Sequence, residues 1–90
     1  MIEFGAAATE NIQAVYDDPS RQRLADRIDE VLRLLDTSPG DKRLRQIRVT
    51  DPPMWGVRIH AGDDEFLIYW DVLSAVTRVR YAGPPPKGLR

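Results

Sequence analysis

The spacing of apolar residues changes once along this chain, near Gly40, and this change constrains the fold more than any other feature of the sequence. Before Gly40 the apolar residues recur at helical spacing, and residues 21–35 carry them as a single stripe. After Gly40 apolar and polar residues alternate, as they do in half-buried strands. Helices followed by consecutive strands are typical of an α+β domain whose helices pack on one face of an antiparallel sheet.

The boundaries of the expected elements follow from breaker residues. Helices are predicted over residues 6–17 and 21–35, with Pro19 ending the first and Ser20 suited to cap the second. Strands are predicted over residues 2–4, 44–50, 54–61, 66–72 and 75–82, and Gly62-Asp63-Asp64 is the clearest hairpin turn. We therefore expect one domain over residues 1–83: a short first strand, a helical hairpin and a four-strand antiparallel meander. Residues 84–90 are expected to form a flexible, proline-rich tail.

Composition excludes several classes of site. The chain has no cysteine and one histidine, so disulfides and thiolate metal sites are excluded and no cofactor is expected. The acidic run 63–65 is interpreted as a solvated turn, with weak cation binding as the alternative. Residues 1–9 show no signal-peptide pattern, and no apolar run approaches the roughly 20 residues that a membrane span needs. We expect a cytoplasmic protein without a membrane partner.

The charge is unevenly distributed along the chain. The formal net charge is −1, which argues against strong nonspecific attraction to nucleic acid. Residues 42–90, however, hold nine of the 13 Lys and Arg residues and only five of the 14 Asp and Glu residues. The strand-forming half is therefore basic although the whole chain is not.

Alternation predicts which side chains lie on the face of the sheet that the helices leave open. These are Arg48, Arg58, His60, Tyr69, Arg78 and Arg80. Arginine forks suit phosphate or carboxylate groups, so a gathered set favours an anionic partner. The alternative is a solvated face whose arginine stems cover apolar surface and hinder aggregation.

The individual aromatic and titratable residues also allow two interpretations each. Trp55 and Trp70 alternate with the core set and are expected to pack there, although both could stack nucleobases. His60 is either an ordinary surface histidine or a proton donor and acceptor. Tyr69 is either a spacer on the sheet face or a contact residue for a ligand.

The order of these elements resembles the RelE/ParE superfamily of bacterial toxins. The stretches that carry the resemblance are Ile2-Glu3-Phe4, the helix to Leu35 followed by Ser38-Pro39, Leu44-Arg45-Gln46-Ile47, Trp55 to Asp63, Leu67-Ile68-Tyr69, and Val79 to Gly83. Together they span most of the chain. The resemblance implies one half of a toxin–antitoxin pair, with a cognate antitoxin as partner.

The resemblance also implies a choice of targets. RelE-like members cut messenger RNA in the ribosome without a metal, and ParE-like members poison DNA gyrase. In the first case Arg58 and Tyr69 match family positions, and His60 occupies a position that is usually Arg. The implied catalytic set is Arg58, His60 and Tyr69, and Arg48, Arg78 and Arg80 would bind RNA.

Some positions depart from the family pattern and favour a second hypothesis. Gly56 stands where nuclease members often have Lys, and the run Gly62-Asp63-Asp64-Glu65 lacks the family's arginine. Pro84-Pro85-Pro86 replaces a basic C-terminal segment. The second hypothesis is a non-enzymatic binding module, either a gyrase-type inhibitor or a degenerate toxin that binds an antitoxin. The third is a plain structural domain, and the oligomeric state stays open.

Overall fold

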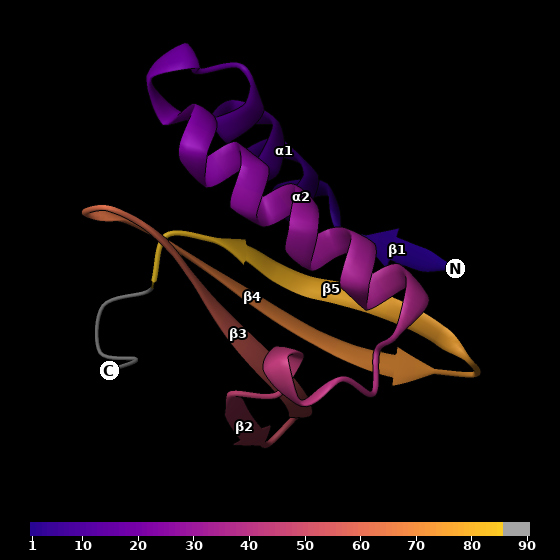
Figure 1. Cartoon of the computed structure of the whole chain (residues 1–90). Helices are drawn as coiled ribbons and strands as arrows, with labels where there is room; N and C mark the ends of the chain where they lie inside the picture. Colours follow the sequence, from indigo (N-terminus) through magenta and orange to yellow (C-terminus); the bar gives the residue numbers. More distant parts are fainter. Residues whose placement is uncertain (86–90) are drawn as a thin grey trace.

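The computed structural model describes residues 1–85 and shows helices packed on one face of a five-stranded sheet (Figure 1). The sheet order is β1-β5-β4-β3-β2. Four consecutive strands form the antiparallel meander: β2 (Ile47–Thr50), β3 (Pro53–Ala61), β4 (Asp64–Leu73) and β5 (Val76–Gly83). The short β1 (Ile2–Phe4) pairs parallel with β5. The predicted fold class, α+β with a short first strand, a helical hairpin and a meander, is confirmed.

The helical hairpin consists of α1 (Ala6–Tyr16) and α2 (Gln22–Thr37), joined by the 3₁₀ turn η1 (Pro19–Arg21). Asp18 caps this turn, because its carboxylate accepts hydrogen bonds from the Ser20 backbone N–H at 3.0 Å and from the Ser20 hydroxyl at 2.6 Å. The prediction that Ser20 caps the second helix was therefore wrong. Asp18 is the N-cap residue of this turn and Pro19 is its first residue. The Asp18 carboxylate can therefore accept the otherwise unpaired N–H of Ser20.

The core lies between the two helices and the sheet. The stripe of α2 contributes Leu24, Ile28 and Leu35, all at most 1% exposed. The facing side chains of β3 and β4 are also buried, at most 3% exposed: Val57, Ile59, Phe66, Ile68 and Trp70. Removing these large apolar groups from water is the main stabilising contribution in a domain of this size.

The last two of the three hairpin turns of the meander differ in backbone chemistry. Gly62 opens the β3–β4 turn with φ +63°, a conformation that glycine adopts readily. In the β4–β5 turn, Ser74 at φ 51° and Ala75 at φ 64° take left-handed conformations without a glycine. Positive φ at both central positions is the type I′ pattern, which Asn-Gly serves best. This mismatch explains why the sequence gives only a weak turn signal there.

Two shifts of register move residues away from their predicted faces. The predicted strand from Leu44 begins instead as a 3₁₀ turn, η2 (Lys42–Leu44), and β2 starts at Ile47. The two-residue turn Asp51-Pro52, whose peptide bond is cis, then sets Arg48 opposite Trp55 on the helix-side face. The prediction that Arg48 lies on the open face was wrong. A strand that pairs one residue out of the expected register has every side chain on the opposite face of the sheet.

A β-bulge between Tyr69 and Trp70 shifts the β4–β5 register. It places Tyr81 opposite Tyr69, with 6.2 Å between the ring centroids, whereas unbroken alternation from the buried Val79 would place Tyr81 on the core face. A bulge adds one residue to one strand and so changes the phase of the alternation beyond it. Strand β5 ends at Gly83, and most of the predicted tail, residues 86–90, lies outside the described residues.

No helix within residues 1–85 is both long enough and apolar enough to span a membrane.

Candidate functional site

On the open face, Tyr69 lies over Gly56 on the neighbouring strand. The two residues are directly paired, and a Cβ added to Gly56 would lie 2.6 Å from Tyr69 Cε1 and 3.0 Å from Ile47 Cβ. Tyr69 is only 6% exposed. The predicted face for Tyr69 is confirmed, but its ring fills the space over a glycine, so packing accounts for this residue. Its catalytic role stays a prediction.

Arg78 and Arg80 lie on the open face as predicted, and both are paired with one carboxylate. Arg78 donates two hydrogen bonds to Asp71, each of 2.8 Å, and Arg80 donates a third of 2.9 Å. The Asp71 side chain is 15% exposed. The hydrogen bonds from Arg78, with a smaller contribution from Arg80, hold the pKa of Asp71 below its usual value despite burial. Much of the positive charge of this pair is therefore already compensated.

On the other face, at the β2 end of the sheet, two arginines stack on tryptophan. The Arg48 guanidinium carbon lies 4.5 Å from the Trp55 ring centroid, and that of Arg45 lies 5.0 Å from Trp55 and 5.6 Å from Trp70. Within residues 1–85 neither arginine forms an ion pair. Trp70 is fully buried and donates an indole hydrogen bond to the Leu44 carbonyl at 3.1 Å. This bond holds the segment from which Arg45 projects.

Arg58 and His60 project from β3 on the open side, as predicted. Their strand has an uncovered edge, because β2 pairs only with residues 53–56 of β3. His60 is exposed, and its Nδ1 lies 3.5 Å from Glu65 across the hairpin. Arg58 donates its backbone N–H to the Gln46 side-chain oxygen at 3.1 Å. Arg58 and His60 are two residues apart and hence about 7 Å apart along the strand.

A groove runs between α2 and this edge of β3. Its larger part, a hollow of about 380 Å³, is lined by Arg27, Glu30, Val31, Leu34, Arg43, Leu44, Gln46, Val57, Arg58 and Ile59. A second hollow of about 220 Å³ includes Arg27 again, with Arg23, Asp26, His60 and Ala61. Four arginines and one histidine thus face two carboxylates, those of Glu30 and Asp26. We call the two hollows together the α2–β3 groove.

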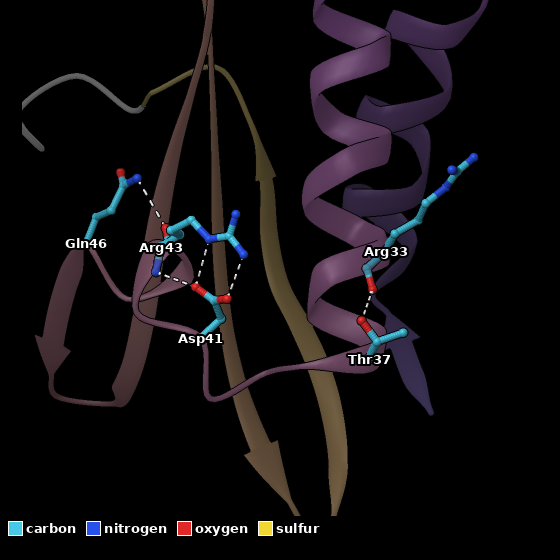
Figure 2. A network of polar contacts seen from close by, with 5 residues as sticks. All are labelled: Arg33, Thr37, Asp41, Arg43 and Gln46. Atoms are coloured by element: carbon cyan, nitrogen blue, oxygen red, sulfur yellow. Dashed lines mark hydrogen bonds and ion pairs between the residues drawn. The ribbon is translucent and has the colours of Figure 1, made fainter.

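The end of the groove near η2 is held by a polar network (Figure 2). Asp41 accepts three hydrogen bonds from Arg43, from its backbone N–H at 2.9 Å and from its guanidinium at 3.0 and 2.8 Å. These bonds lower the pKa of Asp41 to about 2. Gln46 connects this turn to the strand, since its amide donates to the Arg43 carbonyl at 3.2 Å and accepts from Arg58. Contacts within the chain therefore hold this wall of the groove in place without a partner.

The opposite end of the groove is held by an ion pair between the helix and the β3–β4 hairpin. Arg21 donates two hydrogen bonds of 2.9 Å to Asp64, and these hold the pKa of Asp64 below its usual value. The acidic turn was interpreted as simply solvated. Its Asp64 instead fixes the hairpin against the start of α2.

Comparison with protein-family models, curated proteins and solved structures found no match to this chain. The resemblance to the RelE/ParE toxins therefore stays a prediction. Within residues 1–85, no three His, Cys, Asp or Glu side chains are grouped as a metal site would require.

Sequence reasoning missed the arginines that complete these clusters. Arg23 and Arg27 lie outside the apolar stripe of residues 21–35, a position typical of solvated side chains, but they line the groove. Arg45 lay within a predicted strand, and its stacking on tryptophan depends on the η2 turn. The two-residue spacing across Asp51-Pro52 was an available signal for Arg48, because it sets Arg48 opposite Trp55.

Proposed function

We propose that this chain is the toxin-type component of a toxin–antitoxin pair and that its principal activity is to bind a protein partner, with an acidic, extended segment of the antitoxin lying in the α2–β3 groove. The observation that carries the proposal is the uncovered edge of β3 beside a groove rich in arginine. The toxin–antitoxin setting rests on the resemblance of the sequence.

The backbone of β3 supports pairing with an added strand. In an antiparallel strand the N–H and C=O of one residue point to the same side, and successive residues alternate. The Arg58 N–H points to the edge, where Gln46 accepts it. The Arg58 carbonyl and both backbone groups of His60 therefore point to the same edge. An extended segment that pairs there would continue the sheet, which is a common mode of peptide recognition.

The side chains beside the edge supply selectivity for acidic residues. Arg23 forms no ion pair within residues 1–85, and Arg27 approaches Glu30 only at 3.9 Å. Val31 and Leu34 of α2 are partly exposed between these charges. An extended segment that alternates acidic and apolar side chains would match both the arginines and this apolar floor.

Two substitutions at one position distinguish the contribution of the backbone edge of β3 to binding from the contribution of its side chains. His60→Pro removes the N–H that faces the edge and leaves the β3–β4 hydrogen bonds in place, whereas His60→Ala removes the imidazole and keeps the N–H. The two variants are each co-expressed with the products of the genes that flank the gene of this chain, and complex formation is measured by co-purification and calorimetry.

The proposal predicts that His60→Pro weakens the complex at least about 10-fold, the loss of roughly one well-formed hydrogen bond, while His60→Ala binds within about twofold of the parent. Circular dichroism on both variants controls for folding. Equal binding by the parent and the proline variant would contradict pairing at this edge.

A metal-independent ribonuclease that acts on ribosome-bound messenger RNA is the second candidate, and one observation favours it. Arg58 and the exposed His60 share a strand beside Arg23 and Arg27, so a phosphate there would have cationic and proton-transferring groups within reach. Inducible expression with and without Arg58→Ala plus His60→Ala, followed by growth and transcript integrity, tests it. Cut transcripts that the double variant relieves would support cleavage. Growth arrest with intact transcripts would indicate another target such as gyrase.

A further inference from the structure

We propose that the cluster of Arg45, Arg48 and Trp55, which we call the Arg–Trp cluster, is a binding site for a nucleotide unit of single-stranded RNA. The site lies on the helix-side face at the β2 end of the sheet, apart from the α2–β3 groove. This inference does not rest on the proposed function, because neither Arg45 nor Arg48 lines that groove.

A hollow lies beside the Arg–Trp cluster. It has a volume of about 270 Å³ and is lined by Arg45, Arg48, Pro53, Met54, Trp55, Trp70, Asp71 and Val72. Strand β2 lies at the end of the sheet away from the helices (Figure 1), and no helix residue lines the hollow. Val72 is 49% exposed and the adjacent Leu73 is 55% exposed. The site therefore combines two cations with an apolar wall. A nucleotide carries the matching groups, since its phosphate is anionic and its base has an apolar face.

Stacking on the indole orients the two arginines. A guanidinium over an indole face keeps its N–H donors in its own plane, where they are directed outward and can take a phosphate in a bidentate manner. Arg45 is further fixed by a long hydrogen bond from its Nε to the Pro39 carbonyl, 3.4 Å. Because neither cation has an acidic partner within residues 1–85, both charges are available to a phosphate.

Single-stranded RNA matches this site better than an acidic peptide does. Exposed bases stack on guanidinium planes as well as on aromatic rings, and the guanidinium planes of Arg45 and Arg48 over Trp55 supply such a surface here. A carboxylate of a peptide would use the arginine forks but would leave the outer faces of the guanidinium planes and the exposed Val72 without a matching group. A phosphate with an adjoining base uses all of them.

The experiment titrates the full chain with a fluorescein-labelled ten-residue oligouridylate, with uridine monophosphate and inorganic phosphate as separate probes. Fluorescence anisotropy is measured at several salt concentrations. Release of counterions by two phosphate contacts predicts a slope of log K against log salt of about −1.4. The double variant Arg45→Gln/Arg48→Gln is expected to bind at least about 10-fold more weakly, with a slope near zero.

The control is Arg33→Gln/Lys42→Gln, which also removes two positive charges and should leave oligonucleotide binding within about twofold of the parent, because these residues line neither the hollow nor the α2–β3 groove. Arg48→Lys keeps the charge but loses the planar fork, and it should weaken binding by a smaller factor than Arg48→Gln.

Three outcomes would overturn the assignment: no binding by the parent chain, equal losses in the cluster and control variants, or uridine monophosphate binding as tightly as the oligonucleotide. The last result would mean that the ligand of the site is a free nucleotide and not a strand of RNA.

Discussion

Two pairs of arginines lie on the same sheet and differ in what surrounds them. Arg78 and Arg80 share the carboxylate of Asp71, which is 15% exposed, on the open face. Arg45 and Arg48 stack on Trp55 on the other face and have no acidic partner within residues 1–85. The first pair holds two adjacent strands together, and the second is left able to meet an anion. The pairing of arginines, more than their number, therefore decides where a sheet can bind a negatively charged ligand.

The largest expected effect concerns the open face. Gly56→Lys, which would supply the base that nuclease members of the RelE/ParE group often have, should destabilise the fold by about 3 kcal/mol. The reason is that the new Cβ would lie within 3.0 Å of the Tyr69 ring and would displace it. Urea denaturation measures the loss. A variant as stable as the parent would mean that Tyr69 moves freely and that the open face can be made basic.

The second prediction concerns Asp71. Asp71→Asn should cost about 2 kcal/mol at pH 7, because two arginines lose a charged hydrogen-bond acceptor. The folded pKa of Asp71 is depressed, so its contribution to stability is present above the unfolded pKa of about 3.9 and disappears as the pH falls through the lower folded pKa.

Denaturation of the parent and the variant from pH 7 to pH 2 checks this sign. The difference between them should be constant above about pH 5 and should shrink below about pH 4. The variant should also bind the oligonucleotide more tightly, since Arg78 and Arg80 are released. A stability difference that grows on acidification would contradict the assigned pairing.

The third prediction concerns the β4–β5 turn, near the exposed Val72 and Leu73. Ser74→Asn/Ala75→Gly should stabilise the chain by about 1 kcal/mol, because these residues tolerate the positive φ that Ser74 and Ala75 now adopt. Thermal unfolding measures the gain. No gain would argue against the type I′ geometry. The stabilised chain would also be a better background for the variants above.

The smallest effect is expected at the Arg–Trp cluster. Arg48→Gln should cost about 0.5 kcal/mol, the contribution of an exposed cation–π contact. The loss should be the same at pH 7 and pH 3, because no carboxylate takes part. Denaturation at both values tests this, and a loss as large as that of Asp71→Asn would indicate a structural role for Arg48 like that of Arg78.

The sequence was sufficient to predict the element order, the fold class and most strand boundaries, because the helical and alternating patterns are long and uninterrupted. It failed at Arg48 and Tyr81 for a common reason. Alternation assigns faces only until the phase is reset, and the Asp51-Pro52 turn and the bulge at Tyr69 each reset it.

Of the candidate site residues, Arg58, His60, Tyr69, Arg78 and Arg80 were placed on the correct face. Their partners were not predicted. Three such contacts join separate elements of the fold. Asp71 pairs with Arg78 and Arg80, Tyr69 covers Gly56, and Arg23 and Arg27 lie beside the β3 edge. A single sequence carries no direct signal for such contacts.

The most direct test of the account compares the two arginine pairs in one measurement. The side-chain Nε–H resonances of all arginines can be followed by nuclear magnetic resonance while the labelled chain is titrated with the ten-residue oligouridylate. The account predicts that Arg45 and Arg48 shift and saturate together, while Arg78 and Arg80 stay in place because Asp71 holds them. Shifts confined to Arg78 and Arg80, with Arg45 and Arg48 unchanged, would contradict it.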